Sequence, residues 1–433
     1  MFKGPSFKKW GIIIVGLAIR LCVAPFTGHP CDMLLWERFG QSFVVEGVNP
    51  YAVSFAYPPP WILITGLMYR VYLLFPNNLF LSFILKLPII IGDLLVGLTL
   101  FNIVFHITKD QRKAEYAIGL YMLNPYVIWI SSIWGMFDSL PALCTLLAFM
   151  YFVDGKKEFS AIFLGLGIAF KYYPILLLPI VLLYEWKQKK VNDALRYVLY
   201  ALIPLFAFSA PFLVIGWQDY IGQVATVPLM VYRWPSTPAS FLAFIYVFRD
   251  LWPALFDYVM ANSWWVNILS YSLFLAIYAN IILVIHRQKS SSLSRILNSG
   301  VLAALLAVLL SSKMVCEQYF QWAVPFIILD CLVFNGENKR LYNVLWLAFF
   351  TFFSINVPFY NFIWDVQKRE YAYTSFLKPL VDWYEYSVPG IYKSTSLFAL
   401  GLTISITCVW YIYRLLKSVK SSTYTQDHIN VQV

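Results

Sequence analysis

The chain has 433 residues, of which 60% are hydrophobic and only 12% are charged, and its mean hydropathy is +0.68. A soluble domain carries about 25% charged residues, so this composition excludes an ordinary soluble protein and predicts a polytopic membrane protein. The net charge of +10 does not indicate a nucleic-acid partner, because the basic residues gather in short segments between apolar runs. The six cysteines are scattered, with no CxxC and no metal-binding spacing.

Seven basic clusters set the expected orientation, because Lys and Arg mark the cytoplasmic loops of membrane proteins. Seven inside segments, both termini included, imply twelve crossings. The apolar but short piece 61–76 is then re-entrant or interfacial, since a full span there would turn the cluster at 109–113 outward. The clusters are Lys3/Lys8/Lys9, Lys109/Arg112/Lys113, Lys156/Lys157, Lys187/Lys189/Lys190/Arg196, Arg287/Lys289/Arg295, Lys339/Arg340 and Arg414/Lys417/Lys420.

The sequence therefore predicts an all-α polytopic protein with about twelve transmembrane helices. We expect one transmembrane domain over 1–420, containing an extracytoplasmic active-site loop at 27–80, and a polar C-terminal tail over 421–433. The expected spans are 10–26, 80–106, 116–132, 139–153, 159–170, 174–186, 197–215, 264–285, 297–312, 321–335, 341–359 and 392–416. A long outer loop is expected over 216–263.

The stretch 27–61 is the first part of the chain that must leave the membrane. It carries Asp32 just past the first span, then an amphipathic run over 34–44, a turn over 47–51, and Tyr57-Pro58-Pro59-Pro60. Three consecutive prolines cannot continue a helix and favour a stiff extended backbone. We interpret this stretch as an active-site loop on the membrane surface.

Asp32 is the candidate general base, because a carboxylate at the interface can take a proton from a sugar hydroxyl. An acid that merely ends a helix in solvent is an equal alternative. Glu37 is a weaker candidate in the same loop, and a lone loop histidine such as His29 is more often a surface residue. Asp138 opens the fourth expected span, where helix capping is at least as well supported as contact with a ligand.

Lys171, Arg233 and Lys313 are cations at outer helix ends, flanked by aromatic residues. Three cations at one site would suit a phosphate and would neutralise the charge on a lipid-phosphate leaving group. The alternative is that each side chain simply reaches the membrane interface. Lys86 and Asp93 lie on one face of the second expected span, about 10 Å apart along the axis, so each is expected to pair with another helix in a structural role.

Four motifs in order resemble the GT-C membrane glycosyltransferases, and within them the polyprenyl- or dolichyl-phosphate-mannose-dependent enzymes. They are the GxxPY…YPPP loop, WGMFDSLPAL, GLGIAFKYYPILLLP and SSKMVCEQYFQWAVPF. The FK-x-YP pattern contains Lys171 and Tyr172, and the K-x-x-x-x-QYF-x-W pattern contains Lys313, Gln318 and Tyr319. The family that adds the first mannose of GPI anchors shares both patterns, and the likeness covers most of residues 10–335.

The resemblance implies a GT-C fold and an inverting transfer from a lipid-phosphate sugar on the outer membrane face, with Asp32 as base. The implied partners are a polyprenyl- or dolichyl-phosphate sugar donor, a glycan or glycolipid acceptor and membrane lipid, but no nucleic acid. Asp32 is followed by Met33 and Leu34, so the DxD of the GPI enzyme is missing. No metal site is predicted from the residues, although the family leaves a divalent metal as an open alternative.

The sequence thus predicts a hexosyltransferase, with mannose the favoured sugar, in the plasma membrane of a prokaryote or the endoplasmic reticulum of a eukaryote. The predicted substrate-binding residues, besides the base Asp32, are Glu37, Tyr57, Pro58, Asp138, Lys171, Tyr172, Arg233, Lys313, Gln318 and Tyr319. The alternative is a polytopic transporter or a flippase of lipid-linked sugars. Transporters usually show internal repeats and place polar groups near the membrane midplane, whereas the polar groups here gather at the outer rim.

Overall fold

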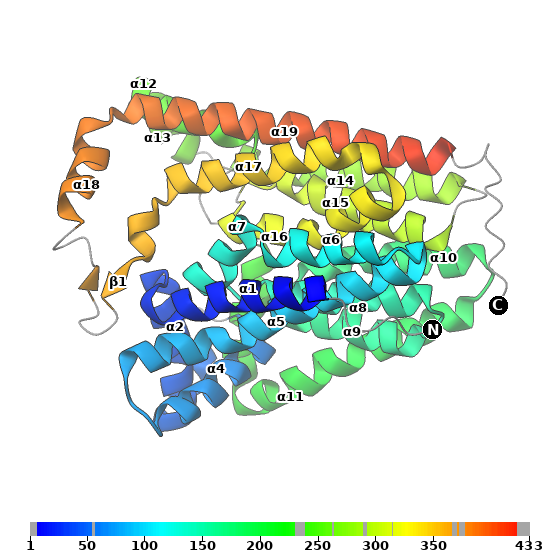
Figure 1. The fold of residues 1–433 in the computed structure, drawn as a ribbon, viewed down its shortest axis with the longest axis horizontal. Helices are drawn as coiled ribbons and strands as arrows, with labels where there is room; N and C mark the ends of the chain where they lie inside the picture. Colours follow the sequence, from blue (N-terminus) through cyan, green and yellow to red (C-terminus); the bar gives the residue numbers. More distant parts are fainter. Residues whose placement is uncertain are drawn as a thin grey trace.

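A computed structural model of the chain is almost entirely helical (Figure 1). It describes residues 7–53, 57–229, 239–261, 264–288, 292–313, 315–365, 370–371 and 377–421. Its helices are α1 Phe7–Val23, α2 Pro30–Gln41, α3 Pro50–Val53, α4 Pro59–Tyr72, α5 Asn78–Thr108, α6 Gln111–Met122, α7 Pro125–Ile128, α8 Ser139–Val153, α9 Lys157–Phe170, α10 Leu177–Lys187, α11 Val191–Leu229, α12 Phe244–Leu251, α13 Pro253–Ala261, α14 Trp264–Arg287, α15 Leu293–Ser311, α16 Phe320–Leu329, α17 Lys339–Asn356, α18 Lys378–Asp382 and α19 Gly390–Ser421. Two short strands, β1 Trp364–Asp365 and β2 Glu370–Tyr371, pair antiparallel.

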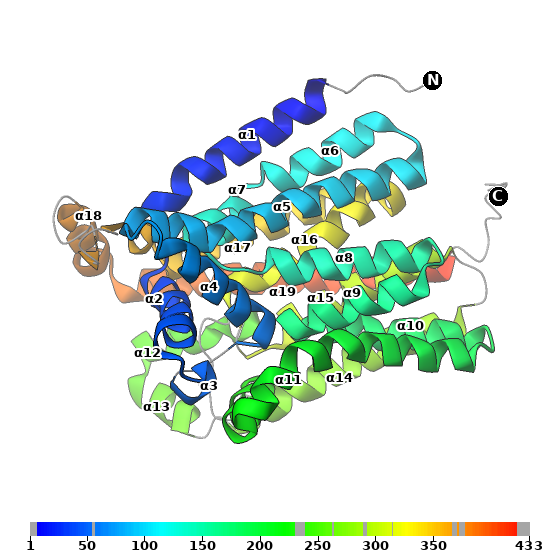
Figure 2. The same ribbon diagram turned by 90° about the horizontal axis from the view of Figure 1, so that it is seen from below.

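The long helices lie side by side in one bundle whose two ends differ (Figures 1 and 2). The start of α1, the end of α19 and the connections α5–α6, α8–α9 and α10–α11 lie at one end, called the basic end below because these connections carry the basic clusters. The short elements α2, α3, α4, α12, α13 and α18 lie at the opposite end, called the loop end. The arrangement agrees with the alternation of basic and polar connections in the sequence.

The prediction of an all-α polytopic membrane protein is confirmed. Among the described residues, six helices are long and apolar enough to cross a membrane: α1, α5, α11, α14, α15 and α19. A seventh span arises if α6 and the segment Pro125–Trp134, bent by 44°, count as one. The count of twelve stays a prediction, because helices such as α9 and α10 are shorter than a full span.

Two local predictions need correction. The prolines after Tyr57 do not form an extended segment: Pro58 precedes α4, and Pro59 and Pro60 are its first residues. Proline suits this position, since its missing N–H would have no partner in the first turn and its φ is already helical. The expected loop over 216–263 is largely helical where it is described, because α11 continues past a break at Gly216 and α12 and α13 follow. The predicted tail beyond 421 lies outside the described residues.

The amphipathic helix of the first loop is confirmed as α2, which buries Trp36 and Phe39. The helix packs against α4 at the loop end, and Gly40 permits the close approach, since a Cβ there would lie 2.5 Å from Tyr69. The short apolar piece expected to be re-entrant or interfacial is α4 itself. Figure 2 shows α4 beside α2 rather than running the length of the bundle.

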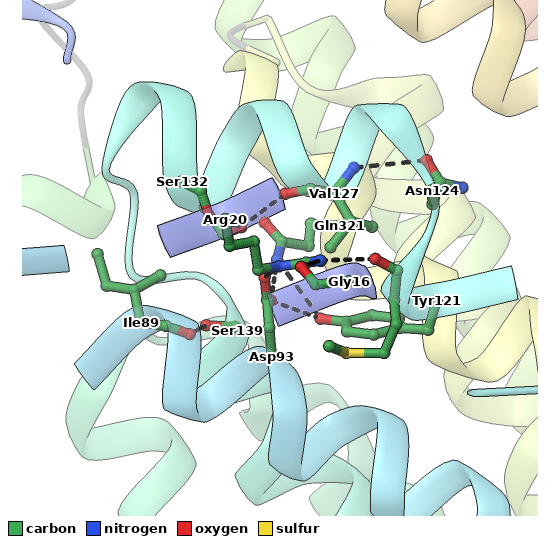
Figure 3. Close-up of polar contacts among 12 residues, drawn as sticks. Gly16, Arg20, Ile89, Asp93, Tyr121, Asn124, Val127, Ser132, Ser139 and Gln321 are labelled. Atoms are coloured by element: carbon green, nitrogen blue, oxygen red, sulfur yellow. Dashed lines mark hydrogen bonds and ion pairs between the residues drawn. The ribbon is translucent and has the colours of Figure 1, made fainter. Parts of the chain in front are cut away.

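Buried polar contacts join α1 to the centre of the bundle (Figure 3). Arg20 Nε donates to Asp93 Oδ2 at 2.8 Å, and both side chains are fully buried. The Arg20 guanidinium also donates to the carbonyl of Met122, while Tyr121 Oη and Gln321 Nε2 donate to Asp93 Oδ1. The expectation that Asp93 pairs with another helix is therefore confirmed.

Lys86 has no carboxylate partner among the described residues and instead donates to backbone carbonyls. Its Nζ lies 3.0 Å from the oxygen of Ala24, 2.5 Å from that of Thr27 and 3.4 Å from that of Ile133. These carbonyls belong to the segment that follows α1 and to the π-helical segment Trp129–Trp134 that follows α7. One buried ammonium thus holds together the two chain segments that lead into the loop end.

Replacing Arg20 by Met should destabilise the protein by about 3–5 kcal/mol, because Asp93 would remain as an uncompensated buried charge. The double variant Arg20→Met/Asp93→Leu should recover most of that loss. Thermal unfolding of detergent-purified protein checks both. Arg38→Met is the matched control, since its partner Glu46 is at the surface and such pairs are worth about 0–1 kcal/mol. Equal losses in the single and double variants would contradict this role.

Candidate active site

The connection from Trp134 to Asp138 forms the centre of the candidate site at the loop end. It follows a π-helical segment, and such segments occur frequently at functional sites. Gly135 turns the chain with φ +97°, and a Cβ there would lie 2.9 Å from Met33 Sδ and 3.2 Å from Lys86 Cε. Trp36 Nε1 donates to the Gly135 carbonyl at 3.1 Å, which ties this connection to α2.

Asp32 lies in the first turn of α2, where the helix dipole favours a negative charge. Its Oδ2 accepts a hydrogen bond of 2.7 Å from Trp134 Nε1. No hydrogen bond to Oδ1 comes from the described residues, and the side chain is 20% exposed. The carboxylate is thus oriented through one oxygen and open to a substrate at the other.

His29 belongs to this arrangement, so the expectation of a surface histidine is wrong. Its ring stacks on Trp134 with centroids 4.9 Å apart and also contacts Phe362. Its Nδ1 lies 3.1 Å from Asp32 Oδ2, which is ion-pair distance for a protonated ring, although the alignment is not that of a hydrogen bond. The His29 amide donates to the Trp134 carbonyl and fixes the start of α2 against the same connection.

Asp138 does not cap α8, because its side chain turns away from the helix backbone. The carboxylate is fully buried; its Oδ1 accepts hydrogen bonds from Lys171 Nζ at 2.6 Å and from Trp322 Nε1. Its Oδ2 has no hydrogen-bond partner within the described residues. The helix-capping interpretation is therefore wrong, and Asp138 pairs with a second predicted site residue instead.

Aromatic rings surround the Lys171 ammonium. Its Nζ lies 5.1 Å from the ring centre of Phe137, 5.6 Å from that of Trp322 and 5.9 Å from those of Tyr57 and Tyr319. Ring faces attract a cation at such distances. Trp322 is sandwiched between Tyr173 and Tyr319 with both centroid distances at 4.1 Å, so this wall of the site is rigid.

The structure thus brings Asp32, Asp138, Lys171, Tyr57 and Tyr319 to one place. The Asp32 charge acts electrostatically on Asp138, and Asp32 and Tyr57 both contact the connection that ends at Asp138, through Trp134 and Phe137 respectively. Tyr172 points elsewhere: its hydroxyl donates to the Val224 carbonyl of α11 at 2.8 Å.

Four of the remaining predicted residues lie within the described part of the chain. Pro58 is buried beside Tyr57 at the start of α4, and Glu37 is half-buried on α2. Lys313 and Gln318 are buried in the connection between α15 and α16, and burial lowers the pKa of Lys313. Arg233 lies outside the described residues, so the three-cation cluster stays a prediction.

Glu317 is a residue that the sequence patterns did not single out. Its side chain is 5% exposed, its Oε1 accepts a hydrogen bond of 3.0 Å from Asn356 Nδ2, and its backbone carbonyl accepts one from the Tyr126 hydroxyl. Burial raises the pKa of Glu317 to about 7, and His29 and Asp32 are near enough to act on it. Its position directly before Gln318 in the K-x-x-x-x-QYF-x-W pattern was the sequence signal that could have identified it.

Within the part of the chain that the structure describes, no three His, Cys, Asp or Glu side chains are grouped to hold a metal ion. Asp32 and His29 offer only two donors, and Asp138 is engaged by Lys171 and Trp322. The described residues therefore do not fit a resident divalent metal.

Several known proteins are similar to this chain. GPI mannosyltransferase 1 of Saccharomyces cerevisiae is 31% identical over 230 residues, which are 49% of this chain and 53% of that protein. The Candida albicans enzyme of the same name is 29% identical over 199 residues, covering 41% and 47%. The Dictyostelium discoideum one is 29% identical over 188 residues, covering 41% and 40%. The chain resembles the GPI mannosyltransferases. The matched part spans about half the length of these relatives.

One family model and one solved structure are also similar to this chain. A family model described as GPI transamidase subunit PIG-U matches residues 40–255. The crystal structure of ArnT from Cupriavidus metallidurans bound to undecaprenyl phosphate aligns over 96% of this chain and 79% of that one, with 14% identity and a TM-score of 0.49. A likeness at that score carries no argument about fold or substrate. The resemblance expected from the motifs is thus confirmed by the sequence relatives.

The pKa of Glu317 predicts a pH dependence of stability. A carboxyl whose pKa is about 7 when folded and 4.5 when unfolded binds more protons in the folded state, so stability falls as pH rises from about 4.5 to about 7. Thermal unfolding at a series of pH values should show this fall in the native protein and a flatter profile in Glu317→Gln. Identical profiles for the two proteins would contradict the assignment.

Proposed function

We propose that this protein is an integral-membrane glycosyltransferase that moves a hexose, with mannose favoured, from a polyprenyl- or dolichyl-phosphate sugar to a glycan or glycolipid acceptor. The site lies at the loop end of the bundle, and the placement of the basic clusters at the opposite end supports an extracytoplasmic site. Support for mannose comes from the relatives, which are named GPI mannosyltransferase 1. The membrane is that of the endoplasmic reticulum in a eukaryote or the plasma membrane in a prokaryote.

The observation that carries the proposal is the geometry of Asp32. A general base must be ionised, oriented and able to reach a substrate hydroxyl. The α2 N-terminus favours the charged form, the Trp134 indole orients Oδ2, and Oδ1 accepts no hydrogen bond from the described residues. A carboxylate that merely ended a helix would need no buried indole from a segment 102 residues away.

The reaction is a displacement at the anomeric carbon. The acceptor oxygen attacks C1 from the face opposite the phosphate, Asp32 Oδ1 takes the hydroxyl proton, and the C1–O bond breaks. The electron pair leaves with the lipid phosphate. This sequence inverts the configuration at C1 and leaves a polyprenyl or dolichyl phosphate as the second product.

Lys171 is the candidate to receive that phosphate. An ammonium has three N–H donors, and within the described residues Lys171 Nζ uses a single donor, in its hydrogen bond to Asp138 Oδ1. The remaining donors lie among aromatic rings at a side chain that is 11% exposed. In such a low-dielectric setting, a charge-assisted hydrogen bond to a developing phosphate is strong. Lys313, buried in the connection before Glu317, is the second candidate cation.

One specific observation favours a second function. The family model that matches residues 40–255 describes a GPI transamidase subunit, and its match begins after Asp32. A subunit that only binds a GPI-type lipid would use the aromatic wall at Lys171 and would need no base. The same expectation holds for a transporter or flippase, so the role of Asp32 separates both alternatives from the transferase.

Replacing Asp32 by Asn should lower sugar transfer by about 10²–10⁴-fold while donor binding is retained, because the amide keeps the shape but cannot accept the proton. The measurement uses purified protein in lipid with radiolabelled polyprenyl-phosphate mannose and, separately, polyprenyl-phosphate glucose. Label is followed into lipid-soluble and water-soluble acceptors. The two donors together report which sugar is used.

Glu46→Gln is the matched control, since Glu46 pairs with Arg38 at the surface of the same loop and should leave transfer unchanged. Glu37→Gln tests the other acid of α2. Transfer that survives in Asp32→Asn but is lost in Glu37→Gln would move the base to Glu37. Donor binding with no transfer in the native protein would support the subunit, and movement of lipid across the bilayer would support the flippase.

Replacing Lys171 by Met should lower kcat/KM for the donor by about 10- to 150-fold, the worth of a hydrogen bond from a charged group to the phosphate. Because the single variant leaves Asp138 unpaired, Lys171→Met/Asp138→Asn is the decisive protein. It should unfold at the same temperature as the native protein yet stay defective toward the donor. Native kcat/KM in a stable double variant would show that the ion pair is purely structural.

A further inference from the structure

A cavity lies between α1, α6 and α17, outside the candidate active site. Its volume is about 610 Å³, within the range of about 300–1,000 Å³ typical of small-molecule sites. Its lining begins with Lys8 and Arg112, at the starts of α1 and α6, and continues to Pro125 at the start of α7. The cavity therefore opens near the basic end of the bundle (Figure 2).

The bend between α6 and α7 gives this cavity a defined polar floor. Asn124 caps α7 with its Oδ1 and donates from Nδ2 to the Tyr342 hydroxyl of α17 at 2.8 Å. Both residues line the cavity. Between the mouth and this floor the wall is mainly apolar, with Ile12, Leu120 and Trp346 contributed by three different helices.

The mouth carries an excess of positive charge. Lys8 and Arg112 line it, and Lys339 Nζ lies 5.9 Å from the ring of Tyr116, another lining residue. Within the described residues, neither Lys8 nor Arg112 forms an ion pair through its side chain. The one acid of the lining, Glu115, is 8% exposed and accepts a hydrogen bond from Gln111. A ligand at the mouth would therefore meet two lining cations that form no ion pair with the described residues, against one largely buried acid.

We propose that this cavity binds one anionic glycerophospholipid from the leaflet at the basic end. The lipid phosphate would contact Lys8 and Arg112 at the mouth, and an acyl chain would run from there along Ile12, Leu120 and Trp346 towards the floor. Basic pockets between transmembrane helices at the cytoplasmic side suit acidic lipid headgroups. The proposal does not depend on sugar transfer, because the two sites share no residue and lie towards opposite ends of the bundle.

The test is native mass spectrometry of the full chain, purified in a neutral detergent and titrated with phosphatidylglycerol or with phosphatidylcholine of identical chains. One phosphatidylglycerol should bind tightly, and phosphatidylcholine at least about tenfold more weakly. Lys8→Gln/Arg112→Gln should remove that preference. Gly119→Leu, which fills the cavity where a Cβ meets only Ile12 at 3.6 Å, should lower binding of both lipids.

Lys113→Gln/Arg340→Gln is the matched control, because both residues are exposed at the basic end and do not line the cavity. An equal loss in this control would show that only the general charge of the basic end attracts the lipid, and would overturn the proposal. Equal affinity for the two lipids, or no effect of Gly119→Leu in a protein that unfolds at the native temperature, would overturn it as well.

Discussion

The loop end of this protein depends on a buried lysine, Lys86, whose amine has no acidic partner among the described residues. Lys86 is fully buried in α5 and donates to the carbonyls of Ala24, Thr27 and Ile133. A charge in that position is costly unless every donor is satisfied, so the two segments that supply the carbonyls must stay together. One segment leads directly into α2 and Asp32, and the other into Trp134 and the connection to Asp138. This constraint keeps Asp32 within hydrogen-bond distance of the Trp134 indole that orients it.

The site combines a partly exposed carboxylate, Asp32, with a fully buried one, Asp138. Asp32 is partly exposed and has an oxygen without a hydrogen bond from the described residues, whereas Asp138 is fully buried and bonded to Lys171 and Trp322. Two acids in one place can take different roles when their surroundings differ so strongly. In the proposed reaction Asp32 meets the acceptor, and Asp138 keeps the ammonium of Lys171 in position for a phosphate.

Much of this arrangement could be predicted from the sequence, because hydropathy and charge act locally. The basic clusters predicted which connections share an end, and the position of Asp32 after the first span predicted an acid at the start of a helix. The partners could not be predicted, because they come from distant segments: Trp134 is 102 residues from Asp32, and Lys171 is 33 residues from Asp138. A tryptophan near a helix end is usually interpreted as an interfacial anchor, and an acid before a helix as its cap. Tertiary packing overrode both interpretations.

The most direct test of the central claim is a structure of the protein with a non-transferable phosphonate analogue of a polyprenyl-phosphate sugar. The account predicts the phosphonate within hydrogen-bond distance of Lys171 Nζ. It also predicts that C1 of the sugar lies between the phosphonate and Asp32 Oδ1, with space for an acceptor hydroxyl beside that oxygen. A phosphonate bound at the basic end, or one at the loop end with Asp32 facing away from C1, would contradict the account.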